Sequence, residues 1–442
     1  MTALILCGGK GRRMGPLRED KWAIEFLGRP LLHDTIDKLR AAGIRNIIFV
    51  GNSTNSGTLR HITAELRDVG CSYVMQQEDN AGMAGAVEAA ATHLADPFLV
   101  VSSNDVVEAD AYRLVLEAAD TGADVALLAA RLDRHFPGGY LVTDERLAVT
   151  HIVEKPRPGE EPSDLVNVVV HYHREAACLL DALHRAQTDR DDRYEAAIEL
   201  LIGEGADVRA VPYQGFWGAI KYPWDLFPIM EHLLGQHEQT YIASTARVSP
   251  RAVLEGVVHV GENVRILENA VVRGPAYLGE GSVIGNNVLV RGGVHLGAHS
   301  VVGFGTEVKH SYIGRGCWFH TNYIGDSIID DGCSFGSGAV TANLRFDEAS
   351  IKATIEDEPV DTGTNKLGVF MGRGCRVGVN ASLMPGVLVG PGAIVGSHVC
   401  LTADLAEGQK AMPSDAYRVE TSDNPVPGPS SPTNDWTGQG GA

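Results

Sequence analysis

The sequence lacks the features of several protein classes. No CxxC pair occurs and the seven cysteines are scattered, which argues against a zinc site or a disulfide framework and favours reduced thiols. No apolar run reaches the about 18 residues that a membrane span needs. The apolar segment at residues 3–7 is too short for a signal peptide. We therefore expect a cytoplasmic protein without membrane association.

Positive charge is also scarce. The chain has 37 Lys and Arg against 56 Asp and Glu, a formal net charge of -19. Such an acidic chain is a poor candidate for binding nucleic acid. It can still bind phosphates in a locally positive pocket, so well-placed basic residues become informative. Neither the dinucleotide pattern GxGxxG nor a P-loop GKS or GKT occurs.

The 442 residues suit two or three domains. Residues 1–235 alternate apolar, strand-like runs with helical patterns. The expected buried strands are 3–7, 46–51, 98–102 and 124–130, and a helix is expected from Leu31 to Ala42. This alternation predicts an α/β, Rossmann-like domain with a mostly parallel sheet and helices on both faces. Such sheets bind ligands at the carboxyl ends of their strands.

From Ile242 the hydrophobic period becomes six. Twelve consecutive positions carry Ile, Leu or Val: 242, 248, 254, 260, 266, 272, 278, 284, 290, 296, 302 and 308. The register slips at Ile313 and Phe319 and resumes from Met371 to Leu401. Neither a helix nor a single strand explains this period, whereas a coil with three short strands per turn does. Residues 242–410 are thus predicted to form a left-handed parallel β-helix of hexapeptide repeats.

Two segments depart from these patterns. Asn343 to Gly368 interrupts the repeat and is predicted to be a loop that projects from the coil. Residues 414–442 carry Pro, Gly, Ser, Asn and Asp with few aliphatic residues, a composition that predicts disorder.

A glycine-rich loop follows the first predicted strand. It reads Gly8-Gly-Lys-Gly-Arg-Arg-Met14. Its glycines let the backbone N–H groups approach a phosphate closely, and its three basic residues add positive charge. The simpler alternative is a tight turn with solvated basic side chains.

The segment Leu6 to Met14 resembles the LxGGxGxRM signature of sugar-1-phosphate nucleotidylyltransferases. Lys21 resembles their second signature lysine, although Asp20 replaces the usual preceding proline. Further resemblances follow in order along the chain: Gly28 to Leu32, Gln77, Gly82-Met83, Asp105, the VEKP segment at Ile152 to Pro156, Asn167, Trp217 and Pro223 to Leu226. Together they cover essentially all of residues 1–230.

The resemblance implies that a sugar-phosphate oxygen attacks the α-phosphate of a nucleoside triphosphate and that pyrophosphate leaves. Arg13 and Lys21 would be catalytic, with Mg²⁺ held by Asp105. The nucleotide would contact Leu6, Gly8, Gly9, Gly11, Gln77, Gly82 and Met83, and the sugar phosphate would contact Gly139, Glu154, Lys155 and Asn167. One departure is Ala219, which stands where the family usually places a second metal ligand; Lys221 follows it.

The predicted coil carries a second resemblance. His320 to Asp326 resembles the HLTYxGD segment of bifunctional N-acetylglucosamine-1-phosphate uridylyltransferases, and Gly336 to Asn343 resembles their GAGTxTxN. Asn343 to Glu348 is closer to the archaeal type.

This second resemblance implies acetyl transfer from acetyl-CoA to an amino-sugar-1-phosphate. His320 would be the base, and Ser337 would lie beside acetyl-CoA in a groove between neighbouring coils of a homotrimer. The acceptor contacts would be Arg291, Lys309, Tyr323, Asn343 and Lys366. Val379, at a CoA-side position, leaves the acyl donor open.

Three hypotheses remain open at this point. The first is a bifunctional enzyme that makes a UDP- or dTDP-sugar. The second is a nucleotidylyltransferase whose coil serves only for trimerisation. The third is a non-catalytic regulatory protein, as in translation exchange-factor subunits that combine the same two domains; Ala219 keeps it open. The sugar is not identified by the sequence, and a cyclitol phosphate also fits.

Overall fold

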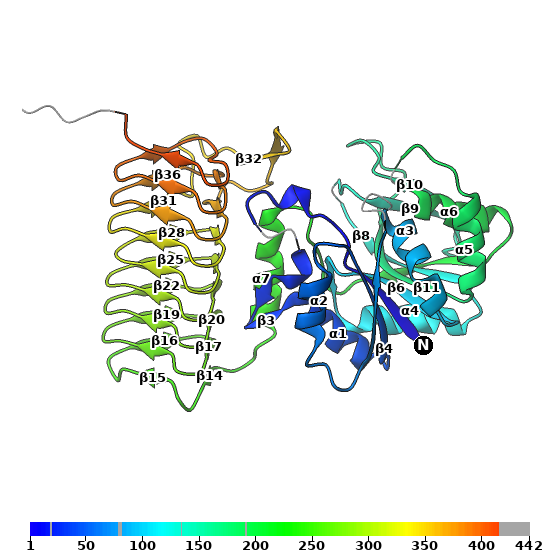
Figure 1. The fold of residues 1–442 in the computed structure, drawn as a ribbon, viewed down its shortest axis with the longest axis horizontal. Coiled ribbons are helices and arrows are strands. Elements are labelled where there is room, and N and C mark those ends of the chain that lie inside the picture. The colour runs from blue at the N-terminus through cyan, green and yellow to red at the C-terminus, as the bar shows by residue number, and fades with distance from the viewer. Residues whose placement is uncertain (18–19, 78–81, 134, 191, 415–442) are drawn as a thin grey trace, which may run out of the picture.

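The computed structural model describes residues 1–17, 20–77, 82–133, 135–190 and 192–414. An α/β domain and a coil of stacked strands lie side by side (Figure 1). The predicted fold class, a Rossmann-like domain followed by a left-handed parallel β-helix, is confirmed. The predicted tail lies almost entirely outside the described residues.

A nine-stranded sheet forms the centre of the α/β domain. Its strands are β1 (Thr2–Leu6), β4 (Asn46–Gly51), β5 (Gly70–Met75), β6 (Phe98–Ser102), β8 (Val125–Arg131), β9 (Gly139–Thr143), β10 (Val149–Glu154), β11 (Leu165–His173) and β12 (Val208–Tyr213). The order β6-β1-β4-β5 is parallel, as predicted. The long strand β11 instead runs antiparallel to both β6 and β8, so only part of the sheet is parallel.

Helices cover both faces of this sheet. One face packs α1 (Leu31–Ala41), α2 (Ser56–Thr63) and α4 (Ala109–Asp120) through Ile36, Leu59 and Val115. The other packs α3 (Gly82–Ala89), α5 (Ala176–Arg185) and α6 (Arg193–Gly203) through Val87, Leu179 and Ile198. This alternation of buried strands and amphipathic helices is what the sequence pattern predicts. None of the helices in the described ranges has the length and apolarity to span a bilayer.

Three parallel sheets form the coil, and successive strands within a sheet are usually 18 residues apart. The first sheet holds β14 (Tyr241–Ile242), β17 (Val258–Val260), β20 (Ala276–Leu278), β23 (Val294–Leu296), β26 (Ser311–Ile313), β29 (Ile328–Ile329), β34 (Phe370–Met371) and β37 (Leu388–Val389). The second holds β15 (Arg247–Val248), β18 (Arg265–Ile266), β21 (Val283–Ile284), β24 (Val301–Val302), β27 (Trp318–Phe319), β30 (Ser334–Phe335), β35 (Arg376–Val377), β38 (Ile394–Val395) and β40 (Lys410–Ala411). The third holds β16 (Val253–Glu255), β19 (Val271–Arg273), β22 (Leu289–Arg291), β25 (Glu307–Lys309), β28 (Tyr323–Gly325), β31 (Val340–Thr341), β36 (Ser382–Leu383) and β39 (Cys400–Leu401).

The six-residue period places one aliphatic side chain inside the coil at each strand. Nine of the twelve predicted positions, from Val260 to Val308, are at most 1% exposed. Ile242 is 46% exposed because it lies in the first turn, where nothing stacks beneath it. The register slips because turns around Ile313 are shortened: Val294 pairs with Ser311, 17 residues on. Ile313 and Phe319 nevertheless remain in the core.

The predicted projecting loop between β31 and β34 contains a short hairpin, β32 (Lys352–Ile355) with β33 (Glu358–Asp361). It reaches from the coil toward the α/β domain (Figure 1). Ile351, Ala353 and Leu367 are buried in the hydrophobic cluster between the domains. The loop therefore contributes to the contact between the domains.

The first sheet of the coil faces helix α7 (Leu226–Gly235) and the hairpin of β2 (Glu25–Phe26) with β3 (Arg29–Pro30). Rings from successive coil turns stack into a ladder, with centroids 4.8–5.1 Å apart: Tyr241, His259, Tyr277, His295 and Tyr312. Phe26 packs edge-on against the last two. The Tyr312 hydroxyl donates to the Glu25 carbonyl over 2.9 Å.

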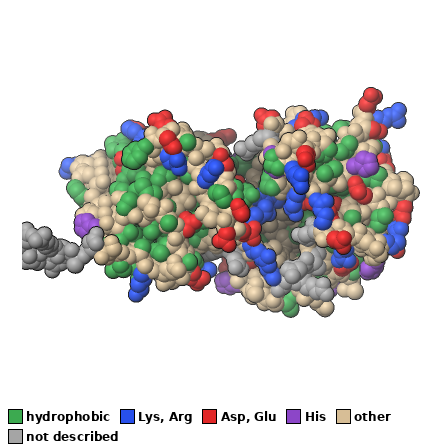
Figure 2. Space-filling model, turned by 90° about the horizontal axis from the view of Figure 1, so that it is seen from above, with side chains coloured by type: hydrophobic (Ala, Val, Ile, Leu, Met, Phe, Trp, Pro, Cys, Tyr) green, Lys and Arg blue, Asp and Glu red, His purple; other side chains and the backbone are tan. Residues whose placement is uncertain are grey.

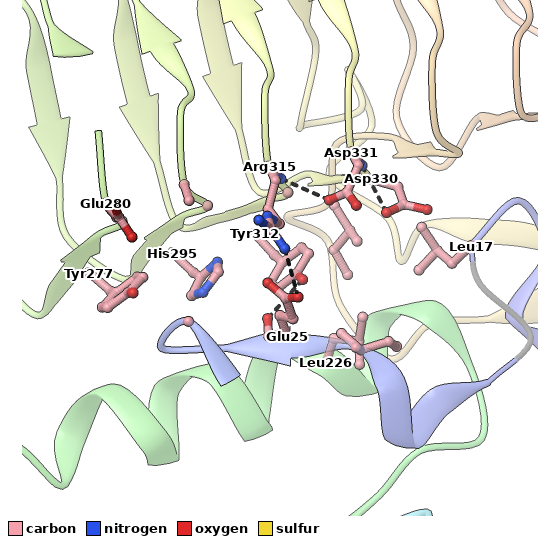
Figure 3. A pocket seen from close by; sticks show the side chains of 16 residues that line it. Leu17, Glu25, Leu226, Tyr277, Glu280, His295, Tyr312, Arg315, Asp330 and Asp331 are labelled. Atoms are coloured by element: carbon pink, nitrogen blue, oxygen red, sulfur yellow. Dashed lines mark hydrogen bonds and ion pairs between the residues drawn. The ribbon is translucent and has the colours of Figure 1, made fainter. Parts of the chain in front are cut away.

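A small cavity of about 170 Å³ remains at this junction (Figure 3). Arg315 crosses it to reach Glu25, with nitrogen and oxygen 3.2 Å apart. The Leu27 N–H donates to His295 Nε2 over 3.1 Å. Polar contacts as well as apolar packing thus fix the two domains against each other.

Candidate functional site

A cavity of roughly 750 Å³ opens at the carboxyl ends of β1 and β6. Lys and Arg side chains gather around this hollow of the α/β domain (Figure 2). It is lined by many of the predicted residues: Leu6, Gly8, Gly9, Arg13, Gly82, Met83, Asp105, Glu154 and Lys155. Residues that the sequence spreads over about 150 positions therefore surround one space.

The glycine loop is held in a fixed conformation. A Cβ atom on Gly8 would lie 2.9 Å from Gln76 Oε1, so a side chain there would displace the Gln76 amide. Gly11 adopts a left-handed φ of 59° at the start of a short 3₁₀ turn. The side-chain amide of Asn52 donates to the Gly8 carbonyl over 3.1 Å, and that of Asn55 donates to the Cys7 carbonyl over 2.9 Å.

Three cations lie together beside this loop. Lys21 is only 7% exposed, and its ammonium donates to the Ile220 carbonyl over 2.7 Å. Burial, followed by the nearby charges of Lys221 and Arg13, lowers the pKa of Lys21 to about 8. The Arg13 guanidinium lies 5.7 Å from the centre of the Tyr222 ring. An anion of high charge density would relieve the repulsion among these cations.

Asp105 lies on β7 (Asp105–Val107), which pairs with β13 (Trp217–Ala219). Trp217 Nε1 donates to Asp105 Oδ1 over 2.9 Å, which leaves Oδ2 for a further ligand. Ala219 is the register partner of Asp105, and its side chain contributes no ligating atom. Within the described parts of the chain, no group of three or more His, Cys, Asp or Glu could hold a metal ion.

The predicted sugar residues also come together. A Cβ on Gly139 would lie 2.8 Å from Glu154 Oε2 and 3.6 Å from the Cβ of Asn167. Lys155 follows Glu154, and its ammonium lies 3.2 Å from Glu154 Oε1. Its φ of 48° is unusual for a residue with a side chain. Gly139 thus leaves a space in which a carboxylate, an amide and an ammonium can contact a sugar.

A buried histidine network fixes the orientation of Asn167. His171 Nε2 lies 2.9 Å from Asn167 Oδ1, while His171 Nδ1 and His173 Nε2 lie 3.0 and 2.7 Å from the Tyr194 hydroxyl. Burial lowers the pKa of both imidazoles to about 3, so both are neutral. Because Oδ1 can only accept, His171 donates to it from Nε2 and accepts the Tyr194 proton at Nδ1. The amide N–H groups of Asn167 stay available to a ligand.

The sequence did not identify every residue of the cavity. Gln76, which is 6% exposed, lines it and donates to the Gly82 carbonyl over 3.0 Å. The predicted Gln77 is exposed and is not one of the lining residues. Glu195 also lines the cavity, and burial together with Glu154 raises its pKa to about 8. Arg193, ion-paired with Glu88 on α3, is a further lining residue. No motif in the sequence points to Arg193 or Glu195, since the segment around them alternates basic and acidic residues.

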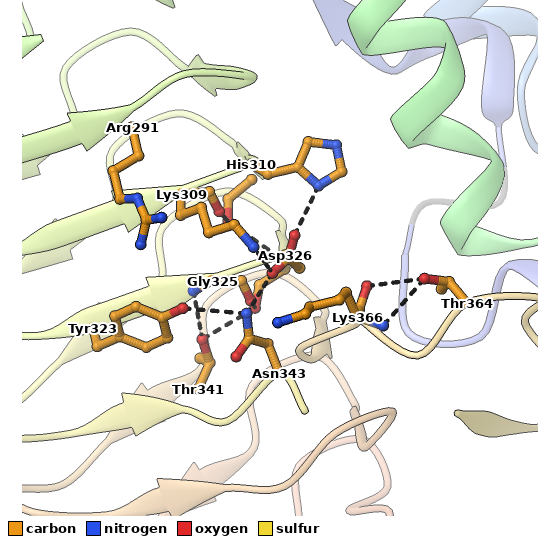
Figure 4. Close-up of polar contacts among 12 residues, drawn as sticks. Arg291, Lys309, His310, Tyr323, Gly325, Asp326, Thr341, Asn343, Thr364 and Lys366 are labelled. Atoms are coloured by element: carbon orange, nitrogen blue, oxygen red, sulfur yellow. Dashed lines mark hydrogen bonds and ion pairs between the residues drawn. The ribbon is translucent and has the colours of Figure 1, made fainter. Parts of the chain in front are cut away.

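The five predicted acceptor contacts gather at the edge of the third sheet (Figure 4). Arg291, Lys309 and Tyr323 come from the successive strands β22, β25 and β28, Asn343 follows β31, and Lys366 lies on the returning segment of the loop. Asp326 lies at their centre. Its side chain is 4% exposed and accepts from Lys309 Nζ over 2.9 Å and from the Asn343 amide.

These contacts order the acceptor residues. The Asn343 amide also donates to the Tyr323 hydroxyl over 3.1 Å. Burial alone would raise the pKa of Asp326, but hydrogen bonds from His310, Lys309 and Asn343 lower it. Lys366 is exposed, and its ammonium points toward Asn343 (Figure 4). The positive charges of Arg291, Lys309 and Lys366 at this edge of the sheet suit a phosphate.

His320 lies outside this cluster, in the turn between β27 and β28. It is exposed, and its ring lies 6.4 Å from that of Trp318. Gly303 and Gly336 occupy the equivalent positions in the turns below and above. A Cβ on Gly303 would collide with the backbone of His320. The His320 imidazole therefore has glycine on either side and is open to a ligand.

Exposed apolar side chains surround this corner of the coil. Phe304 is 62% exposed, Trp318 52% and Val379 44%. Ser337 is exposed in the turn above His320, where the N–H of Gly338 donates to the Thr321 carbonyl. His320 thus lies among exposed apolar side chains at this corner of the coil.

Comparison with known proteins agrees with this geometry. The family described as Nucleotidyl transferase matches residues 2–232, more than half of the chain. A Sulfurisphaera tokodaii protein named bifunctional sugar-1-phosphate nucleotidylyltransferase/acetyltransferase is 28% identical over 90% of this chain and 98% of its own length. Proteins named bifunctional protein GlmU from Methanocaldococcus jannaschii and Methanococcus maripaludis strain C7 are 31% and 33% identical, each over 92% of this chain and 96% of their own. The chain thus belongs to the nucleotidyl transferase family and, through both of its domains, to the bifunctional nucleotidylyltransferase/acetyltransferase family of these archaeal proteins.

Proposed function

We propose that the α/β domain joins a nucleoside monophosphate from UTP or dTTP to a sugar-1-phosphate and releases pyrophosphate. The observation that carries this proposal is one cavity lined by the glycine loop, Arg13, Asp105, Glu154 and Lys155. The buried ammonium of Lys21 lies near Arg13 and Lys221 at this cavity. Two phosphorylated substrates need cationic contacts at both ends of one space, and this cavity supplies them.

The cations would contact different phosphate groups of the substrates. The planar guanidinium of Arg13 suits the oxygens of the triphosphate. Lys21 and Lys221 compensate the charge that builds on the α-phosphoryl oxygens during attack. Lys155 holds the sugar phosphate, and Glu154 and Asn167 accept and donate hydrogen bonds to sugar hydroxyls. Gln76 lies where it can contact the base, which assigns it the role that the sequence gave to Gln77.

The donor set around Asp105 fits Mg²⁺ that arrives with the triphosphate. Mg²⁺ commonly binds one or two carboxylates and completes its coordination with phosphate oxygens and water. Asp105 Oδ2 would supply the protein ligand, and Ala219 explains why only one carboxylate is present. When bound, the metal would neutralise phosphate charge. Lys221 lines the cavity close by and adds a permanent charge to that of the metal.

For the coil we propose acetylation of an amino-sugar-1-phosphate by acetyl-CoA. His320 removes a proton as the sugar amine attacks the thioester carbonyl. A nitrogen–carbon bond forms, the carbon–sulfur bond breaks, and CoA leaves as its thiol after receiving that proton. Arg291, Lys309 and Lys366 would hold the acceptor phosphate, and a backbone N–H near Ser337 would face the oxyanion.

We further propose that three chains assemble through their coils. Phe304, Trp318 and Val379 form an exposed apolar strip beside His320, and a neighbouring coil would cover it and complete the acetyl-CoA groove. We also propose a cytoplasmic location, since all seven cysteines are free thiols.

A panel of nucleotides and sugar phosphates tests both reactions. We expect Mg²⁺-dependent pyrophosphate release with UTP or dTTP and an aldose-1-phosphate, and CoA release with glucosamine-1-phosphate and acetyl-CoA. His320→Ala should abolish CoA release and leave pyrophosphate release intact. A wild-type protein that releases CoA but is silent with every triphosphate would refute the first reaction. Intact CoA release by the His320→Ala variant would refute the assignment of the base.

A further inference from the structure

His310 connects the two domains. It lies in the turn between β25 and β26 with a left-handed φ of 41°. Its Nδ1 lies 2.9 Å from Asp326 Oδ1, and its Nε2 lies 2.7 Å from Oε1 of Glu231 on α7. The ring stacks on Phe227 of the same helix, with centroids 4.8 Å apart. Figure 4 shows the imidazole between Asp326 and the helix.

These contacts determine the protonation of the ring. A neutral imidazole has one N–H, so one nitrogen would direct its lone pair at a carboxylate. Only the imidazolium donates to both Asp326 and Glu231. Hydrogen bonds and charges of these carboxylates raise the pKa of His310 above its usual value despite partial burial. Lys309 is the cation that also faces Asp326.

Asp326 connects His310 to the predicted acceptor residues. The same carboxylate binds Lys309 and Asn343, and Asn343 binds Tyr323. His310 occupies Oδ1, which leaves Oδ2 for Lys309 and Asn343. The position of the carboxylate, and with it the direction of the Lys309 ammonium, thus depends on a contact from the α/β domain.

We propose that His310 is a positioning residue for the acceptor site of the coil: as an imidazolium held by Glu231 of the α/β domain, it orients Asp326 and thereby the side chains that bind the amino-sugar phosphate. This inference rests on the proposed acetyl transfer. It makes recognition of the acceptor dependent on the docking of the two domains and on the protonation of one side chain.

The sign of the pH effect follows. Below the pKa of His310 both carboxylates are bound and the site has its full positive charge. As the pH rises through that pKa, one N–H and one charge are lost, and binding of the acceptor weakens. Glu231→Gln removes one stabilising charge, so the weakening should begin at lower pH.

The experiment measures CoA release with glucosamine-1-phosphate for His310→Gln, Glu231→Gln and the wild type between pH 6 and 9. His299→Gln is the matched control, since His299 is exposed and has a left-handed φ of 58° at another turn of the coil. We expect His310→Gln to raise the KM for the acceptor about tenfold, as for loss of a charge-assisted hydrogen bond. The kcat and the KM for acetyl-CoA should change less than about twofold.

Direct binding separates the inference from the proposed function. Calorimetry with glucosamine-1-phosphate is done in a Lys155→Ala background, which removes the main sugar-phosphate contact of the other site. If His310→Gln weakens the binding of glucosamine-1-phosphate but the wild type releases no CoA, acetyl transfer is refuted and the role of His310 in acceptor binding is retained. The inference is overturned if His310→Gln changes neither the KM for the acceptor nor its affinity. It is also overturned if Glu231→Gln does not lower the pH at which acceptor binding is half lost.

Discussion

Replacing Lys21 by Met tests the charge cluster at the centre of the nucleotidyl site. The buried ammonium lies next to Arg13 and Lys221, and in the proposed reaction it faces the α-phosphate. At an effective dielectric constant of about 20, unit charges about 4 Å apart interact by about 4 kcal/mol. Loss of one preorganised donor typically lowers kcat by about 10²–10³-fold. We expect a decrease in that range, measured as pyrophosphate release at saturating Mg²⁺ and pH 7.

The pH dependence gives a second, independent readout. Lys21 is charged below its pKa of about 8 and neutral above it, so kcat/KM for the nucleotide should fall as the pH rises through about 8. Lys221→Met removes the nearest repelling cation, so the pKa of Lys21 rises and the fall moves to higher pH. Lys410→Met, at the far end of the coil, is the control. The role of Lys21 would be refuted if Lys221→Met did not shift the pH midpoint of kcat/KM. It would also be refuted if the same midpoint remained in Lys21→Met.

Three further predictions concern the sugar site, the metal and the coil. His171→Phe removes the anchor of Asn167 and should raise the KM for the sugar phosphate about tenfold without changing that for the nucleotide; His173→Phe, which leaves the anchor in place, should have the smaller effect. Ala219→Asp places a second carboxylate opposite Asp105 and should lower the Mg²⁺ concentration that gives the half-maximal rate. Ala219→Asn should lower this concentration less. If the wild type and Ala219→Asp depend equally on Mg²⁺, the assigned metal position is contradicted. Ile284→Ala should lower the free energy of unfolding by about 2–5 kcal/mol in urea denaturation, while Ile242→Ala, at an exposed position of the first turn, should be near neutral.

The sequence predicted the coil well because its repeat is local. Each inward position contacts the equivalent position one turn away, so a period of six is sufficient to identify Val260 or Ile284 as core. The period of six fails to identify core residues near Ile313. A turn of 17 residues there changes the register although the strands still stack. Ile324 and Ile329 are fully buried there at five-residue spacings that a strict period passes over.

The nucleotidyl site was predictable where a motif fixes the backbone. Gly8 and Arg13 line one cavity, and Lys21 is buried near Arg13. The difference between Gln76 and Gln77 was not predictable, because adjacent residues after a strand point to opposite sides and only packing against Gly8 and Gly82 decides between them. The contact of His310 with Glu231 joins residues 79 positions apart. It depends on how two domains dock, which neither periodicity nor motif reveals.

The central claim is that Arg13, Lys21 and Lys221, together with the glycine loop and Asp105, gather a nucleoside triphosphate for attack. A crystal structure of the protein soaked with UTP and magnesium tests it most directly. We expect the triphosphate against the N–H groups of the glycine loop, within hydrogen-bond distance of Arg13 and Lys21. A triphosphate bound elsewhere, with both of these side chains turned toward solvent, would contradict it.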